Sequence, residues 1–349
     1  MSQIKTALLS FGMSGQVFHA PFVHLHEGFQ LLGSWERSKK QIKDHYDYVK
    51  SYDTLEEVLE DPEVELVVVN TPTFTHFEYA KKALEAGKHV VVEKAFVGST
   101  AEAEELSQLA SRKQLKLSVF QNRRWDSDFK TVEAVLKGGD LGDIIEARIA
   151  FDRYSPKLSP KTHKEVPSSG AGIIKDLGAH VIDQALTLFG MPNRVFADIG
   201  ETRENSQVDD YFDILLRYEK LRVHVHGGYF FKEQLPGFVL NGTNGTFQKS
   251  RADVQEDQLK AGVKPNDPQY GIEPESDQGL LHFEKQGETF RETIKTLHGS
   301  YMDYYEGVFQ SIRNHKQEPV TAIDGINVMR IIDAAFESAR SGGFVTING

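Results

Sequence analysis

Short, dense runs of hydrophobic residues alternate with longer mixed stretches up to residue 121. The runs predict strands at Ile4–Ser10, Phe29–Ser34, Glu65–Asn70, Lys88–Val92 and Leu115–Gln121. Those at Glu65–Asn70 and Lys88–Val92 contain three consecutive valines, the unbroken apolar character of strands that are buried on both faces. The stretches between them predict helices that begin near Gln16, at Thr54 after an Asp53 N-cap, at Phe77 and at Thr100. Strands that alternate with helices across short loops predict right-handed βαβ units and a doubly wound parallel sheet.

Beyond residue 122 the hydrophobic residues alternate with polar ones instead. Alternating strands are predicted at Ile144–Arg153, Arg194–Arg203, Tyr211–Tyr218, Leu221–Tyr229 and Phe238–Gly242, with a helix at Gly178–Phe189. Short links such as Glu219-Lys220 are typical of hairpins, so we expect a mostly antiparallel sheet with one wetter face. The polar, Pro- and Gly-rich stretch from Arg251 to Gly279 predicts an exposed loop. The amphipathic segment from Asp324 to Arg340 predicts a last helix that covers a core or packs back on the first half.

The composition narrows the possible functions. The chain has 349 residues, more than one hydrophobic core normally holds, so two domains are expected. Its formal net charge of −11 makes it a poor binder of nucleic acid, because phosphates attract basic surfaces. The absence of cysteine excludes disulfides and thiolate chemistry and fits a reducing compartment. The N-terminal sequence lacks the apolar stretch of a signal peptide and no run is long enough to span a membrane, so we expect a cytoplasmic protein without a membrane partner.

The stretch SFGMSG, residues 10–15, directly follows the first predicted strand. It matches the dinucleotide fingerprint G-x-G-x-x-G, except that Ser10 replaces the first glycine. Gly12 would let the backbone approach a pyrophosphate, with Met13 in the same turn, and Ser14 would add a hydroxyl donor. Gly15 would let the helix pack on the strand. An ordinary glycine turn is the alternative, but the strand–turn–helix context favours a Rossmann domain at residues 1–121, followed by a substrate-binding and oligomerisation α+β domain at residues 122–349.

The residues after the second predicted strand bear on the choice of cofactor. Glu36 could hold the ribose hydroxyls of NAD(H), whereas Arg37, Ser38 and Lys39 could hold the 2′-phosphate of NADP(H). A solvated turn is the third interpretation. We expect NADP(H) slightly ahead of NAD(H), because this basic cluster lies in an acidic protein.

Four further stretches place polar or charged residues after predicted strands or at the start of a predicted helix. They are Asn70-Thr71-Pro72-Thr73-Phe74-Thr75-His76, Glu93-Lys94-Ala95, Asn122-Arg123-Arg124-Trp125-Asp126 and GAGIIKDLGAH from Gly170 to His180. In combination, and over essentially the whole chain, they resemble the glucose–fructose oxidoreductase/inositol dehydrogenase (Gfo/Idh/MocA) family. NRRWD, DLGAHVIDQ and Tyr304-Tyr305 look most like the branch that contains NADP-dependent scyllo-inositol dehydrogenase. The resemblance implies an α/β fold: an N-terminal Rossmann sheet, then an α+β domain with a large, mostly antiparallel open sheet.

The resemblance also implies roles for single residues. Lys94 matches the lysine of the family's E-K-P motif, which acts in substrate and nicotinamide binding and tunes the catalytic acid/base. Asp176 and His180 match the D-x-x-x-H motif, in which the aspartate orients the reacting hydroxyl and the histidine moves its proton. The positions that match cofactor-binding ones are Asn70, Thr71, Pro72, His76, Glu93, Asn122, Arg123 and Trp125. Ala95 stands where the family has proline, which leaves open how Lys94 is placed and whether its peptide bond is cis.

The chemistry of hydride transfer agrees with these roles. His180 is a suitable proton acceptor near neutral pH, and Asp176 lies about one helical turn before it. Lys94 would supply positive charge where an alkoxide develops. Each residue alone has a plainer explanation: a solvated lysine after a strand, an aspartate at a helix N-cap, a histidine in a core. Their joint appearance beside a nucleotide fingerprint favours a catalytic site.

Other residues are secondary candidates. Tyr154, His163 and Tyr305 could line a polyol pocket. His224 and His226 alternate on one predicted strand without an evident third ligand, so we expect sheet packing and no metal site. His19 falls close to the expected cofactor, and we assign it no catalytic role.

The sequence therefore predicts a NAD(P)-dependent dehydrogenase or reductase that moves hydride between nicotinamide and a CH–OH group of a cyclic polyol or sugar. A non-catalytic dinucleotide-binding regulator is one alternative, and a reductase of an aldose, a dihydrodiol or a tetrapyrrole is another. Lys94, Asp176 and His180 together argue against the regulator. The expected partners are a small substrate and further copies of the chain, as a homodimer or homotetramer through the C-terminal sheet.

Overall fold

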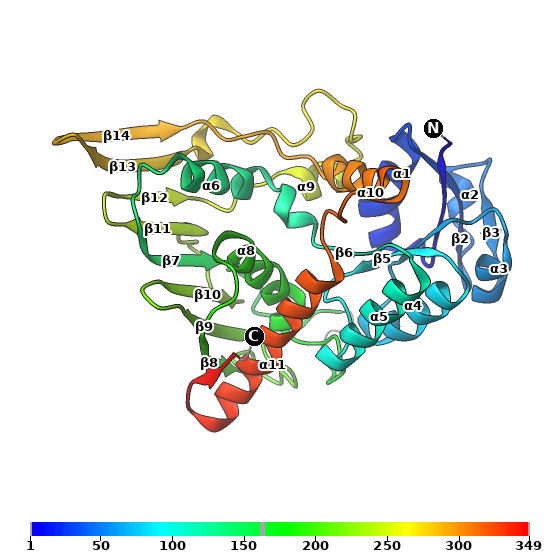
Figure 1. The fold of residues 1–349 in the computed structure, drawn as a ribbon, viewed down its shortest axis with the longest axis horizontal. Coiled ribbons are helices and arrows are strands. Elements are labelled where there is room, and N and C mark those ends of the chain that lie inside the picture. The colour runs from blue at the N-terminus through cyan, green and yellow to red at the C-terminus, as the bar shows by residue number, and fades with distance from the viewer. Residues whose placement is uncertain (1, 161–164, 348–349) are drawn as a thin grey trace. The chain divides into compact units, whose positions relative to one another are not determined.

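Residues 2–160 and 165–347 are described in the computed structural model of the chain, drawn in Figure 1. Packing divides these residues into two compact units. The first consists of the chain up to Asn122 together with Gln255–Tyr270 and Ser300–Ile326, and the second consists of Arg123–Val254, Gly271–Gly299 and the chain from Asn327 onward. The sequence predicts one boundary, between residues 121 and 122, whereas two later segments also group with the first unit.

The first unit is built on a six-stranded parallel sheet with the strand order β3-β2-β1-β4-β5-β6. The strands are β1 (Ile4–Leu8), β2 (Phe29–Trp35), β3 (Lys50–Tyr52), β4 (Leu66–Val69), β5 (His89–Glu93) and β6 (Leu117–Phe120). The sheet grows outward in both directions from β1 and β4, as in doubly wound dinucleotide-binding folds. The predicted doubly wound sheet is confirmed, with β3 as an additional edge strand.

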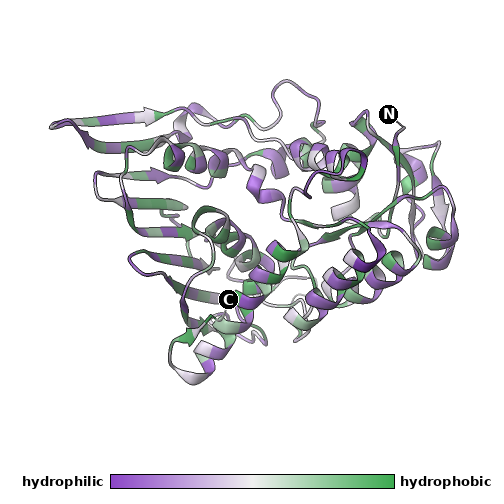
Figure 2. Ribbon diagram, viewed as in Figure 1, coloured by the Kyte–Doolittle hydropathy of each residue, from purple (hydrophilic) through white to green (hydrophobic). Residues whose placement is uncertain are grey.

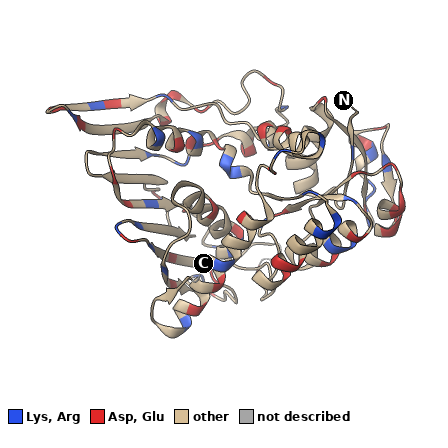
Figure 3. Ribbon diagram, in the orientation of Figure 1, with Lys and Arg blue, Asp and Glu red and all other residues tan. Residues whose placement is uncertain are grey.

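Helices connect these strands. They are η1 (Gly15–His19), α1 (Ala20–Leu25), α2 (Ile42–His45), α3 (Leu55–Glu60), η2 (Thr73–Thr75), α4 (His76–Glu85) and α5 (Thr100–Lys113), joined by α9 (Gln255–Lys260) and α10 (Met302–Asn314) from the later segments. Thr54, rather than the predicted Asp53, caps α3, because its hydroxyl accepts a hydrogen bond of 3.1 Å from the Glu57 N–H. Figure 3 shows charges of both signs on α4 and α5, and Lys81 and Glu105 pair there at 2.8 Å.

The core of the first unit is formed by the central strands and by α10. Val67, Val68 and Val69 of β4 are fully buried. Tyr304 and Tyr305 of α10 are also fully buried. The segment Ser300–Ile326 therefore completes the core of this unit, although it lies far from the strands in sequence.

The second unit is built on a nine-stranded sheet with the order β14-β13-β12-β11-β7-β10-β9-β8-β15. The strands are β7 (Ile144–Ala150), β8 (Arg194–Gly200), β9 (Tyr211–Arg217), β10 (Arg222–Gly228), β11 (Phe238–Gly242), β12 (Gly245–Lys249), β13 (Gly279–Lys285), β14 (Glu288–Ile294) and β15 (Val345–Thr346). Within the described residues β7 and β10 pair in parallel and the other neighbours pair antiparallel, which confirms the predicted mostly antiparallel sheet. Figure 2 shows hydrophobic and hydrophilic residues alternating along its strands; Phe212, Ile214 and Leu216 are the buried positions of β9.

Several helices accompany this sheet. They are η3 (Asn122–Trp125), α6 (Ser127–Gly138), η4 (Ile174–Gly178), α8 (Ala179–Phe189), η5 (Glu275–Asp277) and α11 (Ala322–Ser341), of which η3 and α11 each begin in the first unit. The predicted exposed loop from Arg251 to Gly279 is wrong in part, because it contains α9 and buries Tyr270 and Glu273. Its polar residues have buried partners: Lys249 lies against Glu273, and Gln255 accepts a 2.8 Å hydrogen bond from the Tyr301 N–H.

The described residues include neither a membrane-spanning helix nor a cluster of metal ligands. No helix in residues 2–160 and 165–347 combines the length and apolar character needed to cross a bilayer. Over the same ranges, no group of three or more His, Cys, Asp or Glu side chains is placed to hold a metal ion. His226 lies 2.6 Å from Asp152, and His224 lies 3.7 Å from Asp213.

Candidate active site

The glycine-rich turn between β1 and η1 is closed by its own residues. The Gly12 N–H donates to Ser10 Oγ at 3.2 Å, and Asn70 Nδ2 donates to Ser10 O at 2.8 Å. A Cβ on Gly15 would lie 2.4 Å from Ser10 O, which no side chain tolerates. A Cβ on the exposed Gly12 would meet Ser10 Oγ at an ordinary 3.5 Å. Gly15 is therefore needed by the fold of the turn, whereas Gly12 leaves backbone open to a ligand.

The surroundings of this turn fit a dinucleotide. Asn70 follows β4 directly, at the carboxyl ends of the strands, where open α/β sheets bind ligands. It is 6% exposed, and its Oδ1 has no hydrogen-bond partner among the described residues. A buried amide oxygen without a partner beside an open glycine turn suits a ligand that brings hydroxyl donors, such as a ribose.

Alanine substitutions should distinguish the structural role of Gly15 from the cofactor-binding role of Gly12. Gly15→Ala is expected to lower the stability of the first unit, because the Ser10 carbonyl must move. Gly12→Ala is expected to leave stability unchanged but to weaken dinucleotide binding at least about tenfold, since the backbone can no longer approach the pyrophosphate. Urea unfolding and fluorescence titration with NADPH measure the two effects. A Gly12→Ala protein that binds NADPH normally would contradict the assignment of this turn.

Glu36 follows β2, and its carboxylate is hydrogen-bonded to other residues of the first unit. Its oxygens accept hydrogen bonds from the backbone N–H groups of Gln41 (2.7 Å) and Ile42 (3.2 Å) and from Ser51 Oγ (3.2 Å). The side chain is 7% exposed and holds the start of α2. The predicted alternative of Glu36 as the ribose acceptor therefore competes with three existing hydrogen bonds. Arg37, Ser38 and Lys39 are exposed.

Glu93 and Lys94 lie where β5 ends. Glu93 Oε1 accepts from Ser14 Oγ at 2.6 Å and from His19 Nε2 at 3.0 Å, and Oε2 accepts from the Lys94 N–H at 3.2 Å. Burial alone would raise the pKa of Glu93, but the contacts with His19, Ser14 and Lys94 lower it to about 2. Glu93 is thus ionised, and the predicted hydroxyl donor Ser14 already donates to it. The Lys94–Ala95 peptide bond is cis.

His76 links the turns that follow β4 and β5. One ring nitrogen lies 3.0 Å from Phe96 O and the other 2.8 Å from Thr71 O. Burial lowers the pKa of His76, against the opposing effect of the two carbonyls. The predicted cofactor loop residues Thr71, Pro72 and His76 thus lie in one hydrogen-bonded turn with η2, next to the segment that carries Lys94.

Asp176 and His180 lie at the start of a helix in the second unit. Asp176 belongs to the π-helical turn η4, and His180 to the first turn of α8, where it is 4% exposed. Asp209 fixes this start: its Oδ2 accepts from the Ile174 N–H at 2.9 Å, and it occupies the space of a Cβ on Gly172, whose φ is +91°. Single π-helical turns are common at functional sites.

Other predicted site residues have different surroundings. Arg123 Nη1 lies 3.3 Å from Asp126 Oδ2, next to Asn122 and Trp125 in η3. Tyr154 is 53% exposed, and the Lys232 ammonium lies 5.7 Å from its ring centroid. Tyr305 is fully buried with its hydroxyl 2.6 Å from His19 Nδ1, so it does not line an open pocket. His163 lies outside the described residues.

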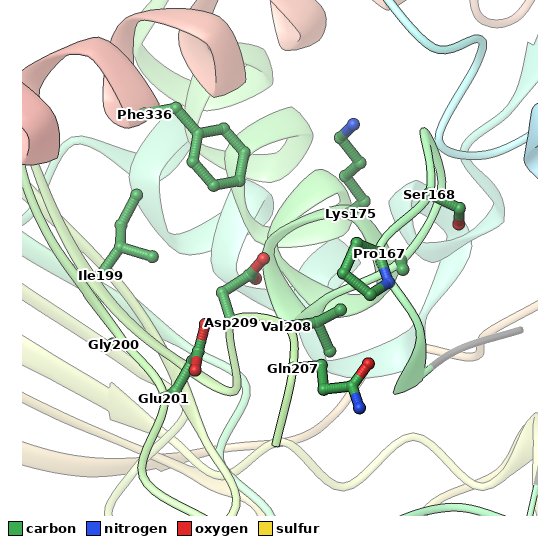
Figure 4. Close-up of a pocket in the computed structure, with 11 residues that line it drawn as sticks. Pro167, Ser168, Lys175, Ile199, Gly200, Glu201, Gln207, Val208, Asp209 and Phe336 are labelled. Carbon is green, nitrogen blue, oxygen red and sulfur yellow. The ribbon is translucent and has the colours of Figure 1, made fainter. Parts of the chain in front are cut away.

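The second unit also contains a cavity of about 580 Å³. Figure 4 shows Lys175, Asp209 and Phe336 around it. The lining is completed by Pro167, Ser168, Ala171, Ile199, Gly200, Glu201, Gln207 and Val208. It borders η4 through Lys175, the neighbour of Asp176, and its mixed lining suits a small molecule with polar and apolar faces.

The sequence and fold of the chain are similar to those of known proteins. Residues 4–121 match the model of the oxidoreductase family with an NAD-binding Rossmann fold (GFO_IDH_MocA), and residues 134–347 match the C-terminal alpha/beta domain of the same family. The chain belongs to the Gfo/Idh/MocA oxidoreductase family. It is 38% identical to scyllo-inositol 2-dehydrogenase (NADP(+)) IolW of Bacillus subtilis, over 97% of this chain and 94% of the relative. A structure of yvaA from Bacillus subtilis has a TM-score of 0.96 at 37% identity and 99% coverage of both chains, and one from Bacteroides fragilis has 0.91 at 42%, covering 99% of this chain and 100% of the other.

Membership of the Gfo/Idh/MocA family makes the chain an NAD(P)-binding oxidoreductase, as predicted. His19, expected close to the cofactor without a catalytic role, contacts Glu93. Tyr229 was not singled out as a site residue in the sequence. Tyr229 follows β10; burial and the charge of Asp176 raise its pKa to about 12. Its position directly after an alternating strand was the only signal for Tyr229.

Proposed function

We propose that this oxidoreductase is an NADP-dependent dehydrogenase that acts on a secondary alcohol of a cyclic polyol or sugar of the inositol type. The observation that carries the proposal is the joint presence of Lys94, Asp176 and His180 in a chain 38% identical to an NADP-dependent scyllo-inositol dehydrogenase. The bound nicotinamide would supply the hydride chemistry.

In this proposal the three side chains divide the work on the alcohol. His180 takes the hydroxyl proton when the alcohol is oxidised and returns it when the ketone is reduced. Asp176 orients that hydroxyl. Lys94 stabilises the negative charge that develops on the oxygen. Asn70 Oδ1, which lacks a partner among the described residues, would accept a hydrogen bond from a ribose hydroxyl of the cofactor.

The residues at the end of β2 support the proposed preference for NADP. Glu36 has its carboxylate engaged by Gln41, Ile42 and Ser51, which leaves the exposed Arg37 as the group best placed to meet a 2′-phosphate. A hydrogen bond to a charged partner contributes about 1.5–3 kcal/mol.

Arg37→Ala is therefore expected to weaken NADPH binding by about tenfold or more and to change NADH binding less than about threefold. Fluorescence titration of both nucleotides at one fixed salt concentration measures this. Arg112→Ala, which removes an exposed arginine of α5, is the control for general electrostatics. Equal weakening of NADPH and NADH would place the discrimination elsewhere, at Glu36.

The substrate class is tested by NADP⁺ reduction with a panel of inositol isomers, aldoses and a dihydrodiol. We expect the highest kcat/KM with one inositol or a related cyclic polyol. Tight NADPH binding without turnover of any substrate would favour the non-catalytic regulator instead. Turnover confined to an open-chain aldose or a dihydrodiol would keep the cofactor assignment and replace the substrate class.

A further inference from the structure

A row of hydrogen-bonded polar side chains, two of them partly buried and two fully buried, lies within the first unit. It runs from Ser14 in the glycine turn to Glu93 at the end of β5, then to His19 at the end of η1, and ends at Tyr305 of α10. The contacts measure 2.6 Å, 3.0 Å and 2.6 Å in that order. None of these four residues has a place in the catalytic steps proposed above.

His19 links Glu93 to Tyr305. Its side chain is fully buried and both of its ring nitrogens are occupied, Nε2 by Glu93 and Nδ1 by the Tyr305 hydroxyl. An ionised carboxylate only accepts, so Nε2 carries a proton. In the neutral ring, Nδ1 then accepts from the Tyr305 hydroxyl. The Phe120 ring packs against the imidazole with 4.5 Å between the ring centroids, and the Phe22 ring stacks on Tyr305 with 5.8 Å between the centroids.

Glu93 joins two turns. Through Oε1 it holds Ser14 of the turn after β1, and through Oε2 it holds the backbone N–H of Lys94 after β5. Only an ionised carboxylate accepts all three hydrogen bonds, since a protonated one must donate from one of its oxygens.

We propose that His19, supported by Tyr305, is a positioning residue that keeps the Glu93 carboxylate fixed and ionised, so that Glu93 holds Lys94 and the glycine turn in their working places. This inference rests on the proposed function for its effect on turnover, but its effect on the glycine turn does not depend on any substrate. His19 acts through Glu93 and is not a catalytic residue.

The contact with His19 affects the pH at which the Glu93 carboxylate becomes protonated. Among the described residues, the titratable groups that interact with Glu93 include His19, Lys94, His76 and Tyr305. Burial by itself raises the pKa of Glu93, and the hydrogen bond from His19 is the largest opposing cause. Without His19 the pKa of Glu93 is expected to rise, so that the carboxylate becomes protonated at a higher pH than in the wild type.

The test compares His19→Leu, His19→Gln and Glu93→Gln in the full-length protein between pH 5 and 8. Glutamine at position 19 can still donate to Glu93, and a glutamine that replaces Glu93 does not titrate. His19→Leu is expected to lower kcat about tenfold at pH 7 and further toward pH 5, with KM for the polyol changed less than about threefold. His19→Gln should recover most of the loss, and Glu93→Gln should lower kcat without the additional acidic decline.

NADPH titration over the same pH range is the readout that needs no turnover. His19→Leu should bind NADPH progressively more weakly toward pH 5, because Ser14 loses its anionic acceptor, while the wild type changes little. If the wild type turns over no substrate, the proposed function fails, and this titration still decides the role of His19.

The surface pair His24 and Tyr48 is a matched control, since its ring nitrogen and hydroxyl lie 2.7 Å apart but are exposed and do not contact Glu93. His24→Leu should leave both pH profiles unchanged. The proposal is overturned if His19→Gln behaves like His19→Leu, or if the pH profiles of His19→Leu run parallel to those of the wild type. A uniform loss that follows the urea unfolding midpoint would mean that His19 only supports the fold.

Discussion

Replacing Lys94 by methionine is expected to lower kcat by about a hundredfold or more, the scale of losing one electrostatic stabiliser of a developing oxyanion. Methionine keeps much of the length of the side chain and removes the ammonium. The hydrogen bond from the backbone N–H of residue 94 to Glu93 does not depend on the side chain, so the turn should persist. NADPH affinity should therefore stay within about threefold of the wild type.

Steady-state kinetics with the best polyol and a fluorescence titration separate these two effects. Lys113→Met is the control, since Lys113 is an exposed lysine of the same unit that contacts only the Glu85 carbonyl in the contacts described, at 3.0 Å. Turnover of Lys94→Met at the wild-type rate would refute the role of the lysine. A large loss of NADPH binding would show instead that Lys94 acts mainly in binding the cofactor.

Lys249→Met is expected to destabilise the second unit by about 3–5 kcal/mol, the cost of leaving a buried carboxylate without its ion partner. Lys249 and Glu273 form an ion pair in which both side chains are fully buried. Ser127 Oγ also contacts Glu273, and Asp277 O accepts from the Lys249 ammonium. Methionine removes the charge and leaves Glu273 in a medium that cannot solvate it.

The pH dependence of this loss gives a second test. Burial raises the pKa of Glu273, although hydrogen bonds from Lys249 and Ser127 oppose the rise. Removing the lysine raises it further. A carboxyl with a raised folded-state pKa contributes stability below its unfolded pKa and loses it as the pH climbs through the folded value. Lys249→Met should thus be closer to the wild type at pH 5 than at pH 8 in urea unfolding.

Two further variants complete this experiment. In Lys249→Met/Glu273→Gln the unpaired charge is gone, so the loss should be smaller than the sum of the single losses. Lys285→Met breaks an exposed pair with Asp140 at 2.8 Å and should leave the urea unfolding midpoint nearly unchanged. A Lys249→Met protein as stable as Lys285→Met would show that the buried pair contributes nothing net.

The sequence predicted the two sheets well because their signals are local. An unbroken run such as Val90-Val91-Val92 reports burial on both faces, and alternation such as that of β9 reports one buried face. The stretch from Arg251 to Gly279 was misjudged for the opposite reason. Its composition resembles a loop, and only the distant partner Lys249 explains how Glu273 can be buried.

The connections within the candidate site could not be predicted from the sequence. The sequence singled out Glu93 and Lys94 because they follow a predicted strand and match a family motif, and the structure places them at the end of β5. Their roles stay a prediction. That Glu93 would be occupied by His19 depends on η1 and β5 lying side by side, which no local pattern reports. Glu36 shows the same limit: its place after β2 suggested a ribose contact, whereas its carboxylate holds the first residues of α2.

The noncontiguous make-up of the first unit has a consequence for how the protein is synthesised. All six strands of its sheet lie before residue 121, but Tyr304 and Tyr305 of α10 fill its core, and Tyr304 donates a 3.0 Å hydrogen bond to Ser118 of β6. A ribosome makes about 5–20 residues per second, so the nascent sheet waits roughly ten seconds or more for these side chains. During that interval its apolar surface is open, and an N-terminal fragment that stops after β6 never closes it.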